Sequence, residues 1–280
     1  MTLKKKINGI ILRTCCFFAA ATMLYPLLWL ISSSLKESSE VFSDAASLIP
    51  HAWKFSNYVE GWRGFGGISF GTFYKNTVFL VVIETIGVVF SSAVVAYGFS
   101  RIKFKGSNFW FVVMLVTMML PQQVLQIPQF VLFNKLGWVN TYLPLIVPAF
   151  FGKVFDIFLI MQFIRGIPYE LDEAAKLDGC NKYKTFFYVV LPLIKPALTT
   201  VAIFTFYAKW DDFMGPLIYI NKPSMYPISL ALRSFSDPSA VTNWGAMFAM
   251  STLSLIPVFI VFFIAQNQIS DGISTTGLKG

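Results

Sequence analysis

The chain has 280 residues, of which 56% are hydrophobic and 13% are charged, and its mean hydropathy is +0.65. Soluble domains carry about 25% charged residues, so this composition excludes an ordinary soluble domain. The formal net charge of +8 comes largely from bases in short loops between apolar segments. That placement indicates membrane topology and argues against nucleic acid as a partner.

The apolar residues gather in six segments of about 20 residues, the length that a helix needs to cross a bilayer. The first segment follows three lysines, but it is too long for a signal peptide, so we expect it to be retained. The expected fold class is all-α, a polytopic membrane protein whose residues 1–280 form a single domain. Its predicted spans are about 10–31, 77–99, 109–133, 141–163, 191–220 and 243–267.

Bases are concentrated in the N-terminal segment and in the loops after the second and fourth predicted spans. The remaining loops are sparser in bases or offset them with acids. Because positively charged loops stay in the cytoplasm, we expect both termini to be cytoplasmic. The bases concerned are Lys4, Lys5, Lys6, Arg101, Lys103, Lys105, Arg165, Lys176, Lys182 and Lys184.

Residue types that commonly carry catalytic chemistry are scarce. The single histidine, His51, leaves no His-based triad or metal cluster. The three cysteines, Cys15, Cys16 and Cys180, match neither a disulfide framework nor a zinc motif. The sequence also lacks a G-x-x-x-x-G-K-[ST] phosphate-binding loop. We therefore expect no catalytic residue, no metal and no cofactor in this chain.

The loop 164–190 carries the signals of a short helix. Pro168 suits the first helical turn, and the three acidic residues after it lie where the helix dipole favours negative charge. Gly179 suits the left-handed residue after the last turn, so we expect a positive φ there. A second helix is expected to begin near Asn181 and to continue into the fifth span. A capped loop helix by itself can be purely structural.

The spacing within this loop is more specific than that of a capped helix. It resembles the EAA motif of ABC importer permeases, with Val189 where the family has an Ile-like residue. The matching positions are Glu173, Ala174, Ala175, Gly179, Leu191 and Pro192.

The similarity extends over nearly the whole chain, to the second, six-span permease of maltose-type carbohydrate importers. Met161 departs from the pattern, because relatives often carry Arg at that position. The segments that carry the resemblance are Asn57–Tyr58, Ala96–Arg101, Phe104–Gly106, Leu120–Pro121, Ile127–Pro128, Pro168–Leu171, Trp210–Phe213, Pro216–Leu217 and Thr276–Gly280.

The resemblance implies the ABC type I importer permease fold and a location in the cytoplasmic membrane of a prokaryote. It implies assembly with a second permease subunit, with two ATPase subunits that bind ATP and Mg, and with an extracytoplasmic sugar-binding protein. In such an assembly the loop helix couples to the ATPase, and the six matching motif residues are the expected ATPase-coupling residues. The chain is then no enzyme, but the subunit that moves a sugar or oligosaccharide.

Two alternatives stay open at this level. The first is a permease of the same superfamily for another solute, such as glycerol-phosphate or a polyamine; an anionic solute would require unpaired bases along its path. The second is a secondary transporter or channel that works alone. That alternative predicts inverted repeats within the chain and leaves the loop motif unexplained.

Charged residues inside the predicted spans are candidates for the substrate path, because intramembrane charges are costly and usually face a cavity or the bundle interior. Lys153 and Asp156 are three residues apart, which places them on one face of a continuous helix. They can neutralise each other or line the path. Tyr207 and Trp210 can offer apolar faces to a sugar ring. The full candidate set is Glu84, Lys153, Asp156, Tyr207, Trp210, Asp211 and Asp212.

Overall fold

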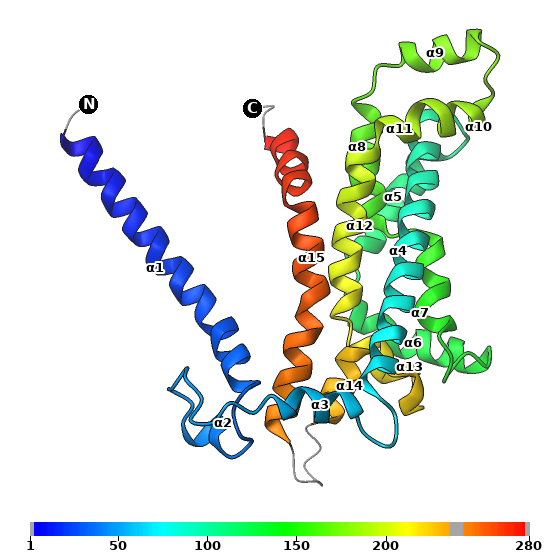
Figure 1. Ribbon diagram of the computed structural model, residues 1–280. Helices are drawn as coiled ribbons and strands as arrows, with labels where there is room; N and C mark the ends of the chain where they lie inside the picture. Colours follow the sequence, from blue (N-terminus) through cyan, green and yellow to red (C-terminus); the bar gives the residue numbers. More distant parts are fainter. Residues whose placement is uncertain (1–2, 236–242, 278–280) are drawn as a thin grey trace. The chain divides into compact units, whose positions relative to one another are not determined.

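The computed structural model describes residues 3–235 and 243–277, and within those residues it contains helices and no strand (Figure 1). The chain forms two compact units, which are described separately below. The first unit comprises Met1–Thr72 and Ala231–Pro257, and the second comprises Phe73–Leu230 and Val258–Gly280. Of the C-terminal segment singled out in the sequence, Leu278–Gly280 lie outside the described residues.

The first unit is built on two long apolar helices and the loop that follows the first of them. Its elements are α1 (Leu3–Ser33), α2 (Glu40–Ser43), α3 (Ser56–Arg63) and the N-terminal part of α15 (Trp244–Gly277). The ring of Trp29 packs edge-on against Phe248 at 5.2 Å, and its Nε1 donates a hydrogen bond to the carbonyl of Ala45 at 2.8 Å. The apolar segment Gly9–Ser33 buries none of its most hydrophobic window, so its surface is available to lipid or to another chain.

Lys36 organises the loop that follows α1. The side chain is fully buried, and its Nζ donates to the carbonyls of Asp44 at 2.8 Å and Ser47 at 2.7 Å. The amide of Asn57 on α3 donates to the Lys36 carbonyl at 2.8 Å. A buried ammonium is tolerated only when hydrogen bonds replace its water, so this loop is folded around one lysine side chain. The sequence pattern alone counts Lys36 merely as one base of an outer loop.

We predict that Lys36→Met loosens residues 37–49. The substitution removes both donated hydrogen bonds, and a carbonyl left unpaired in a buried site costs about 1–3 kcal/mol. Amide hydrogen exchange in the assembled protein should rise across this loop. Lys54→Met is the matched control, because the Lys54 side chain forms an exposed ion pair with Glu37 at 3.5 Å and such pairs contribute about 0–1 kcal/mol. Equal exchange in the two variants would contradict the role of Lys36.

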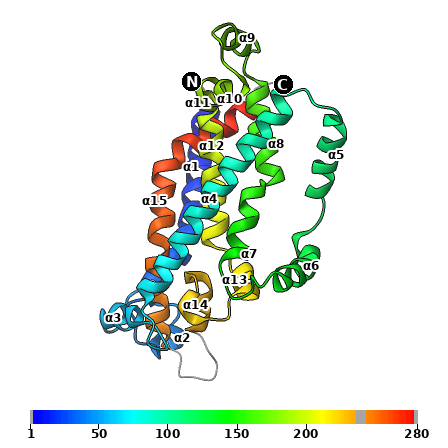
Figure 2. The same ribbon diagram turned by 90° about the vertical axis from the view of Figure 1, so that its right-hand side faces the viewer.

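The second unit is a helical bundle that runs from α4 to the C-terminal part of α15. Its longer helices are α4 (Phe70–Arg101), α5 (Ser107–Met118), α6 (Gln122–Lys135), α8 (Val154–Arg165), α9 (Glu170–Leu177) and α12 (Lys195–Trp210). The short elements are α7 (Leu143–Ile146), η1 (Val147–Phe151), α10 (Lys182–Thr185), the π-helix η2 (Phe186–Val190), α11 (Leu191–Leu193), α13 (Met214–Tyr219), η3 (Pro223–Met225) and α14 (Ile228–Ser234). Figures 1 and 2 both place α9, α10 and α11 at one end of this unit and α6, α7 and α13 at the other.

Four helical segments are long and apolar enough to cross a membrane, or up to six if two bent helix pairs each count as one span. The first bent pair is α5 with α6, at an angle of 101°, and the bend falls at Pro121, directly before α6 (Figure 2). The second pair is Lys182–Leu193 with α12, at an angle of 75°. The six predicted spans match this count when each pair is a single span. In the fifth of them, α12 ends at Trp210 and α13 is a separate short helix.

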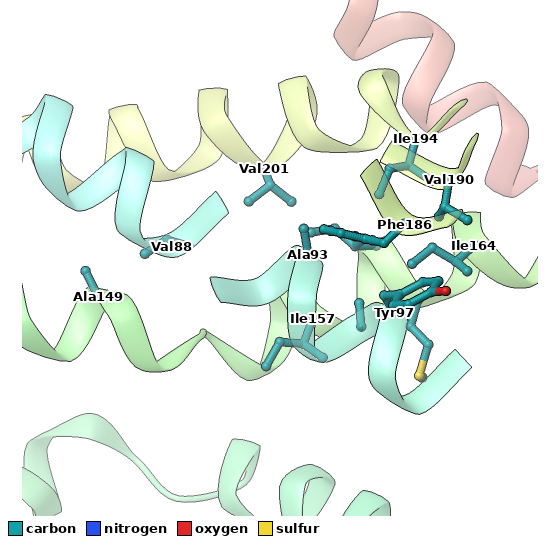
Figure 3. Packing of buried hydrophobic residues seen from close by; sticks show 13 residues of the cluster. Val88, Ala93, Tyr97, Ala149, Ile157, Ile164, Phe186, Val190, Ile194 and Val201 are labelled. Carbon is teal, nitrogen blue, oxygen red and sulfur yellow. The ribbon is translucent and has the colours of Figure 1, made fainter. Parts of the chain in front are cut away.

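The core of the second unit packs α4 against α8, η2 and α12 (Figure 3). Small residues allow the close approach, since Ala93 and Ala96 of α4 lie among larger side chains such as Phe186 of the π-helix. A Cβ atom on Gly87 would come within 2.9 Å of the Phe150 ring, so this position of α4 also requires a small residue.

The fourth predicted span is broken at Gly152 and Lys153. Gly152 has a φ of +81°, and the backbone of Lys153 is extended, so α8 begins only at Val154. Two serines of α4 satisfy polar groups at the break: Ser91 Oγ donates to the Ala149 carbonyl at 3.1 Å, and Ser92 Oγ accepts from the Lys153 N–H at 3.2 Å. Lys153 and Asp156 therefore do not share one face of a continuous helix, and that expectation from the sequence is wrong.

Candidate functional site

The loop 164–190 folds as its sequence signals indicate. α9 spans Glu170–Leu177 with three acids in its first turn. Gly179 has a φ of +81°, which confirms the expected left-handed residue, and the next N–H, that of Cys180, donates to the Ala175 carbonyl at 2.9 Å. This pattern satisfies a carbonyl that the helix end would otherwise leave unpaired. Asn181 then caps α10 by accepting from the Lys184 N–H at 2.9 Å.

Some of the motif residues are buried and others are exposed. Ala175 is buried, whereas Glu173 and Ala174 are exposed and Leu177 is 90% exposed. Leu191 packs against the core of the unit, and it lies with Pro192 in α11, where the chain turns into α12. One face of α9 is therefore exposed, while Ala175 and Leu191 pack within the chain.

The guanidinium group of Arg101, the last residue of α4, holds the first half of the loop. Its Nε lies 3.1 Å from Asp172 Oδ2 of α9, and its Nη2 donates to the Ile167 carbonyl at 2.7 Å. The same group lies over the Tyr169 ring, 5.5 Å from its centroid. The Arg101 and Asp172 side chains are only 8% and 12% exposed, so solvent screens this pair weakly.

The second half of the loop contacts Tyr97, which lies one turn before Arg101 on α4. The hydroxyl of Tyr97 donates to the Lys182 carbonyl at 3.0 Å, and its ring packs against Phe186 at 4.9 Å. The end of α4 therefore holds α9 through Arg101 and α10 through Tyr97. From the sequence, Arg101 counts only as a topology signal; its place in a segment that resembles carbohydrate importers is the one clue to a further role.

Arg101→Gln should release α9 from α4. Breaking a fully buried ion pair by removing one partner costs about 3–5 kcal/mol, and the slight exposure of Asp172 reduces that figure here. Hydrogen exchange should rise across 167–178. Arg101→Lys should rescue only in part, because a point charge does not reproduce the planar fork that reaches both Ile167 and Asp172.

Arg165→Gln is the control for that experiment. The guanidinium of Arg165 lies over the Phe111 ring at 5.7 Å, and no ion pair is formed with it among the described residues. Arg165→Gln should leave the amide hydrogen exchange of α9 unchanged. If Arg101→Gln also leaves it unchanged, Arg101 does not attach α9 to α4.

A polar cavity of about 350 Å³ lies elsewhere in the second unit, away from the loop. Its wall combines α4, the start of α6, the break before α8 and the end of α12. Five of the lining side chains are polar: three are charged, one carries an amide and one carries a hydroxyl. The lining residues are Val88, Gln122, Leu145, Pro148, Ala149, Gly152, Lys153, Thr205, Ala208, Lys209 and Asp212.

Glu84 of α4 and Lys209 of α12 form an ion pair beside this cavity, with Nζ 2.5 Å from Oε2. Glu84 is almost fully buried, whereas the Lys209 side chain is 30% exposed and lines the cavity. The sequence identifies Glu84 as a costly intramembrane charge but offers no neighbour for it. The partner is 125 positions away, so only the fold brings the two together.

The other candidates from the sequence are distributed unevenly. Lys153 and Asp212 line the cavity. Lys153 and Asp156 form no direct ion pair among the described residues, and their mutual neutralisation stays a prediction. Asp156 is buried, and neither of its carboxylate oxygens is hydrogen-bonded to another residue that the structure describes. Trp210 packs against Tyr74 and Phe206 and is not part of the cavity lining.

Two further candidates also lie outside the cavity wall. The hydroxyl of Tyr207 donates to the Val258 carbonyl at 3.4 Å, and Asp211 is exposed at the end of α12. Conversely, Thr205 and Gln122 line the cavity without having been identified from the sequence. A hydroxyl and an amide carry too little sequence signal in an apolar segment to stand out.

One cluster of potential metal ligands occurs in the first unit. His51 Nε2 lies 3.2 Å from Asp44 Oδ2, and a carboxylate oxygen of Glu40 completes a group within 4.8 Å. None of the three residues is buried. Exposed groups of this kind pair readily without an ion, so the cluster is an ion pair of the loop that Lys36 organises.

The two partners of the intramembrane ion pair should respond unequally to substitution. Lys209→Met leaves a buried carboxylate without a counter-ion, whereas Glu84→Gln leaves an ammonium that still reaches the cavity. We therefore predict the larger loss of thermal stability for Lys209→Met, with the double variant milder than the sum of the two single changes. Additive effects in this double-mutant cycle would show that the pair contributes no coupling.

Comparison with known proteins finds similar chains over most of the sequence. Residues 85–275 match the family described as binding-protein-dependent transport system inner membrane component. The "Probable ABC transporter permease protein YurM" of Bacillus subtilis is 37% identical over 94% of this chain and 86% of its own length. The arabinooligosaccharides transport system permease protein AraQ of Halalkalibacterium halodurans is 32% identical over 94% of each chain.

The fold is also similar to that of a solved structure. A chain in the crystal structure of a bacterial ABC transporter involved in the import of the acidic polysaccharide alginate superposes with a TM-score of 0.84 at 23% identity. The match covers 95% of this chain and 98% of that one.

Proposed function

This chain belongs to the family of binding-protein-dependent transport system inner membrane components, and from that premise we propose that it carries a sugar or oligosaccharide across the cytoplasmic membrane of a prokaryote. It is the permease of an ABC importer, a transport subunit rather than an enzyme. The carbohydrate substrate is supported by the arabinooligosaccharide permease among its relatives and by the sequence segments that resemble carbohydrate importers.

The proposed assembly contains a second permease subunit, two ATPase subunits that bind ATP and Mg, and an extracytoplasmic binding protein. The uncovered apolar surface of Gly9–Ser33 suits contact with lipid or with the second permease. The exposed face of α9 suits contact with an ATPase. We propose that both termini and α9 are cytoplasmic, because the basic loops lie on that side by the positive-inside rule.

The mechanism that we propose transmits force along α4. Movement of an ATPase subunit displaces α9, and the attachment of α9 to Arg101 is the observation that carries this proposal. Seventeen residues earlier on the same helix, Glu84 pairs with Lys209 beside the polar cavity. At 1.5 Å per residue, a rigid α4 links the loop to the cavity over roughly 25 Å. Rocking of α4 then changes the access to the cavity as the transporter alternates between its two states.

The two alternatives, a transporter that works alone and a permease for another solute, fit the structure and the family membership to different degrees. A transporter that works alone leaves the exposed face of α9 and the family membership without a role. A permease for glycerol-phosphate or a polyamine would share the coupling loop, so it differs from a sugar permease only at the cavity.

Ala174→Asp should uncouple the transporter. Ala174 is exposed on α9, so the change leaves the fold of the chain intact but adds bulk and charge to a close-packed docking surface. Burial of an unpaired charge there should lower sugar-stimulated ATP hydrolysis and transport together, by on the order of tenfold or more. Both are measured on the purified complex in proteoliposomes.

Ala174→Ser is the matched control, since it preserves a small side chain at the same position. Co-purification with the second permease should be unchanged in both variants. A complex with Ala174→Asp that alters sugar preference while hydrolysing ATP at the wild-type rate would contradict the proposed docking role.

A further inference from the structure

We infer that the polar cavity binds an uncharged, hydroxyl-rich solute unit and discriminates against both anionic and cationic solutes. This inference rests on the proposed function and deepens it by naming the charge class of the carbohydrate. The cavity volume of about 350 Å³ lies within the range of small-molecule sites, roughly 300–1,000 Å³.

Thr205 marks the cavity as a ligand site. Its side chain lines the cavity and is 2% exposed, yet its Oγ1 has no hydrogen-bond partner within the described part of the chain. Two other threonines of α12 behave differently, because Thr199 and Thr200 donate to the carbonyls four residues earlier, at 3.0 and 2.9 Å. A buried hydroxyl without a partner costs free energy, so Thr205 is poised for a solute that donates to it or accepts from it.

The charges around the cavity are mixed in sign. Lys153 and Lys209 bring two ammonium groups, and Asp212 brings a carboxylate that already accepts one hydrogen bond from the Gly215 N–H at 3.0 Å. Glu84 is engaged with Lys209, and the buried carboxylate of Asp156 lies three residues beyond Lys153. Of the charged groups that line the cavity, Lys209 is neutralised by Glu84, which leaves one ammonium, on Lys153, and one carboxylate, on Asp212.

This arrangement favours hydroxyl groups over ions. A solute hydroxyl can donate to the lone pairs of the Asp212 carboxylate that the Gly215 N–H does not occupy, and it can accept from the Lys153 ammonium. Both are charge-assisted hydrogen bonds. An anionic solute would meet the Asp212 carboxylate, and a cationic one would meet two ammonium groups, each in a setting where like charges repel strongly. The cavity therefore does not suit an acidic saccharide, in contrast to the alginate that the structurally similar transporter imports.

The test measures saccharide binding to the purified complex without its binding protein, by equilibrium dialysis. The probes are three neutral trisaccharides (arabinotriose, maltotriose and chitotriose), trigalacturonate and spermidine. At least one neutral trisaccharide should bind at least tenfold more tightly than trigalacturonate and spermidine. Thr205→Val should weaken that binding about tenfold, a factor equal to roughly 1.4 kcal/mol. Thr205→Ser, which keeps the hydroxyl, should restore most of it.

Two further variants sharpen the test. Thr199→Val is the matched control, because the Thr199 hydroxyl is already bonded within α12 and lies outside the cavity; its binding should equal wild type. Asp212→Asn should shift the preference toward trigalacturonate, since it removes the carboxylate that repels an acid.

The inference is overturned if trigalacturonate or spermidine binds as tightly as the best neutral probe, if no neutral probe binds, or if Thr205→Val binds like Thr199→Val. Failure of the proposed function looks different: the wild-type complex with its binding protein would then show no saccharide-stimulated ATP hydrolysis. Normal stimulation with an unaffected Thr205→Val variant would reject the cavity inference alone.

Discussion

The attachment of α9 to the last residue of α4 is the interaction on which the proposed coupling depends. A single guanidinium group binds a carboxylate, a backbone carbonyl and the face of a tyrosine ring, all within the first half of one loop. One turn earlier, Tyr97 holds the second half. Because α4 also carries Glu84, the helix joins the surface that we assign to the ATPase with the cavity that we assign to the solute. A loosely attached loop would absorb the movement of a partner instead of passing it on.

The same physical constraint shapes the interior of the second unit: polar groups away from water need partners inside the protein. At the break before α8, Ser91 and Ser92 supply partners for backbone groups that a continuous helix would have paired internally. Beside the cavity, Lys209 supplies the counter-ion for Glu84. Among the threonines of α12, Thr205 is the exception within the described residues, and its unpaired hydroxyl is the reason that we assign a solute to the cavity. Breaks in the helices and buried charges thus concentrate around the cavity.

Local signals in the sequence were sufficient for part of this account. Apolar length indicates the helical membrane class, and an acidic first turn followed by a glycine predicts α9 and the positive φ of Gly179. Pairings over long separations were not accessible, because periodicity does not reveal that Lys209 meets Glu84 or that Arg101 meets Asp172. Gly152 produced the clearest error. Its left-handed backbone interrupts a segment that reads as one continuous helix, and this interruption separates Lys153 from Asp156 as a helical pair.

The central claim is that α9 and the end of α4 move as one body. The most direct measurement is the distance between spin labels at Lys103→Cys and Leu177→Cys, by double electron–electron resonance in the assembled transporter. The native Cys15, Cys16 and Cys180 are replaced by Ala so that only these two positions are labelled. Both labelled positions are exposed. Rigid attachment predicts one narrow distance distribution that is the same with and without ATP, and a broad distribution when Arg101 is replaced by Gln. A distance that changes with ATP in the otherwise wild-type chain would contradict the claim, because α9 would then move independently of α4.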